Sequence, residues 1–141
     1  MPVSAEALTR DEVLRWAGDL YARAVDHKDA TGFAAAFTAD AWLRFGNAPP
    51  VVGRESIRAA IAQFYTTFAE LRHESKGAWF DGETLILEAV VTYTRHDQRV
   101  VSVPAVTIFR LVGVERDREG RPAPVADQCR IYVDLAPLFA P

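Results

Sequence analysis

The sequence predicts an α+β fold: a single cone-shaped domain in which about three N-terminal helices pack on a strongly curved, mixed or antiparallel sheet. Apolar residues recur at helical spacing in the first half of the chain, and long β-type runs replace this pattern after Leu71. Turn-forming residues separate the runs. Helices that cover one face of a curved sheet can enclose an apolar hollow, so we expect an interior pocket.

The composition favours a globular domain over residues 1–141, large enough to form a core without disulfides. The formal charge of −3 provides no basic surface for nucleic acid. No apolar run approaches the roughly 20 residues that span a bilayer, so we expect no membrane association. The single cysteine, Cys129, cannot form an internal disulfide, and the first residues lack the apolar run of a signal peptide. We therefore expect a cytoplasmic protein.

The first helix is predicted to begin after Thr9. Thr9 and Glu12 form a capping box, in which each side chain accepts a hydrogen bond from a free backbone N–H of the first turn. Tyr21 falls at the edge of the apolar stripe of this helix, and its hydroxyl is directed either inward or outward. The stripe itself contains Val13, Trp16, Ala17, Leu20 and Ala24.

Two further helices are expected before the sheet. Asp29 caps a short second helix in which Phe33, Ala36 and Phe37 share a face, and Asp40 precedes a strand over 42–45. Gly53 is an acceptable N-cap for a third helix. Its apolar face contains Ile57, Ala60, Ile61, Phe64 and Phe68.

The second half of the chain is predicted to form the main strands. Asp81-Gly82 predicts a type I′ hairpin, in which both central residues have positive φ. A second reversal is expected at 96–98, and the charged, Gly- and Pro-containing segment 115–124 is expected to be an exposed loop. The predicted strands cover 71–80, 84–95, 99–112 and 125–135.

Two of these strands carry signals beyond their own formation. Pro104 lies inside the run 99–112, where its missing N–H predicts a bulge or a bend. Residues 85–91 and 100–108 are apolar on both faces, unlike a strand with one face in water. We therefore expect one face to pack on the helices and the other to form a homodimer through the sheet.

Several short motifs in this order carry a family resemblance. They are Tyr21, Ala24-Val25-Asp26 with Asp29, the segment 37–41, the segment 50–55, and the segment 132–135. Together they resemble the SnoaL-like branch of the nuclear-transport-factor-2-like superfamily, which includes ketosteroid isomerases. The resemblance implies the cone fold over nearly the whole chain. It does not fix the chemistry, because this superfamily contains isomerases, cyclases, dehydratases, hydrolases, carriers and assembly modules.

The family's known sites match this chain only in part. The tyrosine donor of ketosteroid isomerases corresponds to Tyr21, but their two carboxylates fall at Phe45 and Val103, which are apolar. An enolisation needs a base as well as oxyanion donors, so this isomerase site is disfavoured. The Asp–Arg–Asp set of limonene epoxide hydrolases is disfavoured as well, because its positions fall near Val90, Glu88 and Ile131.

The dehydratase-like members provide the remaining enzymatic interpretation. Their first-helix carboxylate corresponds to Asp26, whereas their sheet histidine falls closer to Gly77 than to His73. A shift of four residues in the alignment restores an Asp26–His73 dyad, in which the carboxylate fixes the histidine tautomer. The alternatives are a rim position for His73 and, for Asp26, a backbone hydrogen bond that caps the turn between the first two helices.

The pocket walls are predicted from the apolar inventory. Aromatic residues at these spacings also fit a plain core, and Asn47 corresponds to a loop that borders the pocket mouth in relatives. In the last strand, Tyr132 and Asp134 share one face and Cys129, Ile131 and Val133 the other; only one set faces the hollow. The expected binding residues are Trp42, Phe45, Asn47, Phe64, Phe68, Tyr93, Tyr132 and Asp134.

The sequence therefore predicts a small-molecule binding protein or an acid–base enzyme of isomerase, cyclase or dehydratase type. Its ligand is expected to be a hydrophobic ring or carbonyl compound, with Tyr21 as hydrogen-bond donor and Asp26 with His73 as base. No cofactor and no metal are expected. The alternative is a non-catalytic dimerisation or ligand-carrier domain whose interior is filled by its own side chains.

Overall fold

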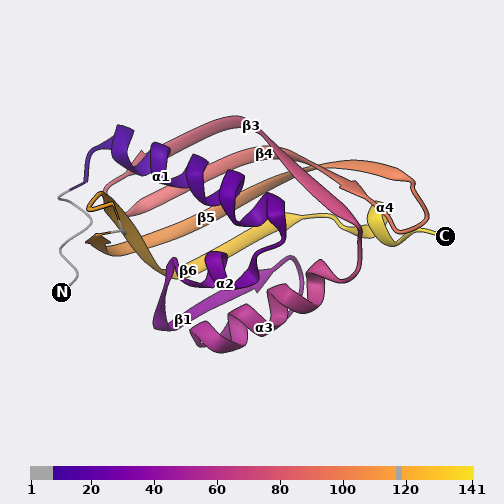
Figure 1. The fold of residues 1–141 in the computed structure, drawn as a ribbon, viewed down its shortest axis with the longest axis horizontal. Coiled ribbons are helices and arrows are strands. Elements are labelled where there is room, and N and C mark those ends of the chain that lie inside the picture. The colour runs from indigo at the N-terminus through magenta and orange to yellow at the C-terminus, as the bar shows by residue number, and fades with distance from the viewer. Residues whose placement is uncertain (1–7, 117–118) are drawn as a thin grey trace.

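The computed structural model describes residues 8–116 and 119–141, and these form an α+β fold (Figure 1). Three helices and a short 3₁₀ turn precede most of the strands, as predicted, and a fourth short helix follows the last strand. The elements are α1 (Arg10–Arg23), η2 (Val25–His27), α2 (Ala30–Ala34), β1 (Phe37–Phe45), β2 (Val51–Val52), α3 (Arg54–Tyr65), β3 (Glu70–Asp81), β4 (Thr84–Thr94), β5 (Val100–Arg116), β6 (Pro122–Val133) and α4 (Ala136–Phe139).

All six strands belong to one mixed sheet. The strand order is β2-β1-β6-β5-β4-β3. Only the β1–β6 pair is parallel, and the other neighbours are antiparallel. In Figure 1, α1 lies across β3, β4 and β5, whereas α2 and α3 lie at β1. The helices therefore cover two different parts of one sheet face, and the core lies between them and the sheet.

The predicted helix starts are confirmed, because each depends on local capping. The Thr9 hydroxyl accepts a hydrogen bond from the Glu12 N–H at 3.1 Å, and the Glu12 carboxylate accepts one from the Thr9 N–H at 3.3 Å. The Asp29 carboxylate accepts a hydrogen bond from the Gly32 N–H at 2.9 Å. Gly53 precedes α3 at φ +99°, a conformation that favours glycine.

The link between α1 and α2 is attached to the start of β3. Lys28 adopts the left-handed conformation at φ +58°, which ends η2 and redirects the chain. Its ammonium donates hydrogen bonds to the carbonyls of Phe68 and Ala69 at 3.0 and 3.1 Å. These bonds connect residues 40 and 41 positions apart, so η2 is held beside β3.

The first strand differs from its prediction. It begins at Phe37 rather than at Trp42, so Phe37 and Asp40 belong to the strand and not to the end of α2. Phe37 is fully buried and pairs with Ala126 of β6. Its ring still contacts Phe33 of α2, at 5.2 Å between centroids. The helical spacing of Phe33 and Phe37 thus reflects a real contact between α2 and β1, although the helix does not continue to Phe37.

Two turn predictions were also wrong in detail. Asp81 pairs with Thr84, so the turn residues are Gly82 and Glu83, and only Gly82 has a positive φ, of +63°. The reversal is present, but the type I′ turn over Asp81-Gly82 is not. The segment predicted as a loop, 115–124, contributes to β5 and β6 at its two ends, where Glu115 pairs with Ala123; residues 117–118 lie outside the described residues.

Pro104 does not form a bulge. It pairs with Val90 of β4 without a register shift. On its other side β6 has ended, because the last residue of β6, Val133, pairs with Ala105. A proline is tolerated where a strand lacks a neighbour, since no partner needs its missing N–H.

Candidate functional site

Asp26 and His73 form a close pair at the inner face of the sheet. The Nδ1 atom of His73 lies 2.7 Å from Asp26 Oδ1, and the backbone N–H of His73 donates to Asp26 Oδ2 at 3.2 Å. Both side chains are largely buried, with 17% of the His73 side chain and 21% of the Asp26 side chain exposed. Both oxygens of Asp26 thus interact with His73, which contradicts the rim position for the histidine and the turn-capping role for the carboxylate.

A bulge in β3 determines which side chains face the helices. The register between β3 and β4 shifts between Ser75 and Gly77. Before the shift, Leu71, His73 and Ser75 alternate inward; after it, Ala78 takes the inward position and Gly77 does not. The hydrogen bonds from the Lys28 ammonium to the carbonyls of Phe68 and Ala69 then hold η2, which contains Asp26, against this part of β3.

In this geometry His73 can act as a base. The carboxylate of Asp26 accepts the Nδ1–H, so the neutral ring carries its proton on Nδ1 and Nε2 keeps a free lone pair. When Nε2 takes up a proton, the adjacent carboxylate stabilises the imidazolium. The same contact fixes the orientation of the ring.

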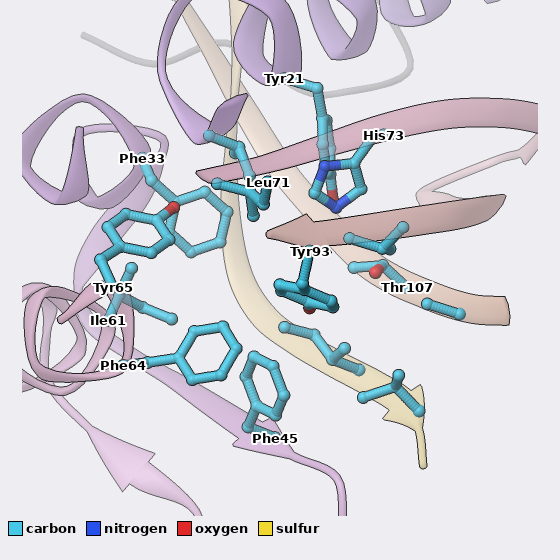
Figure 2. A pocket seen from close by; sticks show the side chains of 15 residues that line it. Tyr21, Phe33, Phe45, Ile61, Phe64, Tyr65, Leu71, His73, Tyr93 and Thr107 are labelled. Atoms are coloured by element: carbon cyan, nitrogen blue, oxygen red, sulfur yellow. The ribbon is translucent and has the colours of Figure 1, made fainter. Parts of the chain in front are cut away.

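Tyr21 and Thr107 complete the polar group. The Tyr21 ring contacts the His73 ring edge-on, at 4.7 Å between centroids and an interplanar angle of 67° (Figure 2). Burial raises the pKa of the Tyr21 phenol, and a side-chain hydrogen bond with Thr107 acts in the opposite direction. Tyr21 is therefore protonated at neutral pH and can donate a hydrogen bond.

Two cavities meet at these side chains. The inner chamber, with a volume of about 50 Å³, lies towards α3 and β1, and the outer groove, of about 440 Å³, lies between α1 and strands β3, β4 and β5. Tyr21, His73, Ala105 and Thr107 line both, and we call this set the junction. Asp26 lines the groove.

Three of the predicted aromatic wall residues surround the inner chamber. Phe45, Phe64 and Tyr93 line it. Phe68 is fully buried behind them, and its ring centroid lies 5.1 Å from that of Phe64 and 4.9 Å from that of Tyr93. Figure 2 shows Phe45 and Phe64 facing one another below Tyr93. Sequence reasoning missed Phe33, Tyr65 and Thr107, although Tyr65 follows Ile61 at helical spacing and Thr107 alternates with Phe109.

The other predicted wall residues lie elsewhere. Trp42 alternates with the buried Ala41 and Leu43 and so faces away from the core. Tyr132 is 46% exposed and accepts a hydrogen bond from Arg44 at 2.8 Å. Asp134 accepts one from the Ala136 N–H at 2.9 Å, and Asn47 lines a separate surface hollow with Arg44 and Tyr132. Ile131 and Val133, from the other face of β6, line the inner chamber.

The positions that correspond to the ketosteroid-isomerase carboxylates remain apolar in space. Phe45 lines the inner chamber and Val103 is buried, so no carboxylate occupies them. Of the positions near the epoxide-hydrolase set, Ile131 lines the inner chamber, whereas Glu88 is exposed. Among the described residues no three His, Cys, Asp or Glu side chains are grouped to hold a metal ion. Within the same residues, none of the helices is both long and apolar enough to cross a bilayer.

The fold has many solved counterparts in the nuclear-transport-factor-2-like class. An NTF2-like protein of unknown function from Burkholderia pseudomallei K96243 has a TM-score of 0.71 and 18% identity, over 91% of this chain and 95% of that chain. A candidate SnoaL-like polyketide cyclase from Jannaschia sp. CCS1 has a TM-score of 0.71 and 18% identity, over 100% and 96%. TerC, co-crystallised with polyporic acid, has a TM-score of 0.67 and 13% identity, over 90% and 95%.

The sequence identifies the family within this class. The model of the SnoaL-like domain matches residues 18–116, which is more than half of the chain. The protein therefore belongs to the SnoaL-like domain family, as its motifs predicted. No curated protein matches the chain.

Proposed function

We propose that this protein is an acid–base enzyme of isomerase, cyclase or dehydratase type that acts on an apolar ring or carbonyl compound. The observation that carries the proposal is the Asp26–His73 pair, 2.7 Å apart, on the wall of a cavity of about 440 Å³. This volume is within the range of small-molecule sites, roughly 300–1,000 Å³, and the lining is mostly apolar.

The proposed chemistry starts with removal of a proton next to a carbonyl group. His73 Nε2 takes the proton from carbon, the C–H electron pair forms the enolate, and Asp26 stabilises the imidazolium. The Tyr21 hydroxyl donates a hydrogen bond to the enolate oxygen. The imidazolium then returns the proton to another carbon in an isomerisation or to a leaving hydroxyl in a dehydration; in a cyclisation the enolate carbon attacks a second carbonyl and the new alkoxide takes the proton.

The first test is proton exchange on β-tetralone, a flat bicyclic ketone with acidic protons next to its carbonyl. In deuterated buffer the protein is expected to speed the exchange of these protons, followed by NMR. His73→Gln is expected to lower the protein-dependent rate by about 10²- to 10⁴-fold, the usual contribution of a positioned base. His96→Gln, a substitution in the 96–98 turn, is the matched control.

The competing function is that of a non-catalytic dimerisation or ligand-carrier domain with a filled interior. The small volume of the inner chamber, about 50 Å³, favours it, because the protein's own rings occupy most of the interior. A protein that binds β-tetralone but leaves its exchange at the buffer rate would support carriage and contradict the enzymatic proposal.

We also propose a homodimer through the outer sheet face. Trp79 pairs with Ile86 and Ile86 with Ile108 across three strands, so these apolar side chains share the face opposite the helices. Trp79 is 53% exposed, and its indole lies over Gly77. Sedimentation is expected to give a dimer for the wild type and a monomer for Ile108→Asp; a wild-type monomer at micromolar concentration would contradict the proposal.

A cytoplasmic location remains a proposal as well. It is supported by Cys129, which is fully buried and unpaired, as suits a reducing compartment. Cell fractionation that recovers the protein outside the cytoplasm would contradict it.

A further inference from the structure

We infer that the ligand binds across two compartments: a flat apolar body in the outer groove beneath α1, its oxygen at the junction, and at most a water- or methyl-sized group in the inner chamber. The inference depends on the proposed function only for the identity of the reacting atom. The placement of the ligand follows from the cavities and is tested by binding.

The two volumes determine which part of a ligand each cavity accepts. A water molecule takes up about 30 Å³ of liquid, so the inner chamber, at about 50 Å³, has room for a water or a methyl group but not for a ring. The groove is many times larger, at about 440 Å³. A ring system therefore lies on the α1 side of the junction.

The polar groups determine how the ligand is oriented. Within the groove lining, the polar residues Tyr21, Asp26, His73 and Thr107 lie together at or next to the junction. Thr107 is buried, with only 8% of its surface exposed. The polar residues Ser75 and Glu88 lie at the exposed rim. Between these ends the lining is apolar. A ligand with a single carbonyl or hydroxyl oxygen satisfies this pattern with the oxygen at the junction and the ring over the apolar wall.

The groove exists because small residues face one another across it. Ser75, Ala89 and Ala105 form one row across β3, β4 and β5, since each pairs with the next. The neighbouring rows contain larger residues, such as His73 with Val91 and Leu87 with Thr107. Three of the α1 residues that line the groove are small as well, namely Ala17, Gly18 and Ala22, and they lie between or beside the larger Leu14 and Tyr21.

Gly18 provides a way to fill the groove without disturbing the polar group. A Cβ atom built on Gly18 meets no other atom within 4 Å, so a longer side chain extends into open space. Ala22, one turn further along α1, is exposed at the groove rim and offers a second position. Neither residue contacts the Asp26–His73 hydrogen bonds.

The test uses β-naphthol, a fluorescent flat bicycle with one hydroxyl, and measures its dissociation constant by fluorescence titration. Gly18→Leu and Ala22→Leu are each expected to weaken binding about tenfold or more, because a filled pocket rejects the larger ligand. Arg15→Leu, at an exposed position of α1 outside the groove lining, is the control and is expected to bind like the wild type. Val91→Ile, which fills part of the inner chamber alone, is expected to change binding less than about twofold.

Each result decides between the two placements. Wild-type affinity in both leucine variants, or strong loss of affinity in Val91→Ile, would place the ring in the inner chamber and overturn the inference. Thermal unfolding confirms that each variant is folded, and Ala22→Leu at an exposed position keeps the test valid if Gly18→Leu does not fold. Binding in the groove without β-tetralone exchange would leave this inference intact and remove the proposed function.

Discussion

The inner chamber and the outer groove share one sheet face, but their side chains differ in size. Around the chamber, aromatic rings contact one another: Phe45 with Phe64 at 4.8 Å, Phe64 with Phe68 at 5.1 Å, and Phe68 with Tyr93 at 4.9 Å. Around the groove, alanine, glycine and serine leave space. We infer that the size of the side chains along a few cross-strand rows determines which part of this fold is a packed core and which part contains a cavity.

The difference separates stability from function. Aromatic pairs contribute about 0.5–1.5 kcal/mol each beyond the area they bury, so the chamber end stabilises the fold. The groove end holds the pair of side chains suited to acid–base chemistry. Substitutions at the two ends are therefore expected to affect different measurements.

The largest expected effect is on stability at the chamber end. Phe68 is fully buried among Phe64, Tyr65 and Tyr93. Phe68→Ala is expected to lower the free energy of unfolding by about 3–5 kcal/mol, because it leaves a cavity. Urea denaturation measures this value. The groove in the folded variant is expected to bind β-naphthol with wild-type affinity, and a loss of affinity after correction for unfolded protein would mean that the two ends are coupled.

The converse substitution is Asp26→Asn at the groove end. The amide does not stabilise a protonated imidazole, so the β-tetralone exchange rate is expected to fall by about 10²-fold or more. Its effect on the unfolding free energy is expected to be about 1–3 kcal/mol, less than that of Phe68→Ala, because the amide leaves one hydrogen bond of a largely buried pair unmade. Asp29→Asn, which retains a helix-capping oxygen, is the control; an equal loss of exchange in that variant would contradict a specific role for Asp26.

Alkaline pH is expected to act at both ends through buried tyrosines. Burial raises the pKa values of Tyr21, Tyr65 and Tyr93 above the ordinary 10.0. The unfolded chain therefore loses these protons first, and their stabilising contribution, complete below pH 10, decreases as the pH rises further. The slope is about 1.4 kcal/mol per pH unit for each tyrosine. The tyrosinate absorbance of these three side chains is expected to appear together with unfolding; ionisation of all three in the folded protein would contradict this.

The smallest expected effect is a gain in stability. Gly18→Ala is expected to raise the free energy of unfolding by up to about 1 kcal/mol, because alanine favours the helix and its methyl group meets open space. Thermal unfolding measures the gain. A decrease would show that α1 is packed more closely over the groove than the cavity indicates.

The sequence allowed prediction of the features that depend on neighbours in the chain. Two helix starts followed from Thr9 and Asp29, whose capping contacts lie within a few residues, and the third followed from Gly53, which precedes its helix at a positive φ. The family followed from short motifs. The second reversal, at 96–98, is confirmed as well, with Gln98 in the left-handed conformation.

The candidate site was harder to predict, because it depends on long-range register. Asp26 and His73 are 47 positions apart, and simple alternation places Gly77 and His73 on one face. The bulge between Ser75 and Gly77 breaks this parity and leaves His73 inward. The face of β6 was undecidable for a similar reason: Cys129 and Ile131 turn inward because they pair with Phe109 and Thr107 of β5.

Lys28 has a consequence for how the site holds its shape. Its ammonium bonds to the carbonyls of Phe68 and Ala69 join the turn that carries Asp26 to the strand that carries His73. A sliding motion of the first helix along the sheet has to break this bridge before the carboxylate and the imidazole can separate. The alignment of the two groups is thus set within the fold, by the hydrogen bonds of a third residue that lies outside the pair.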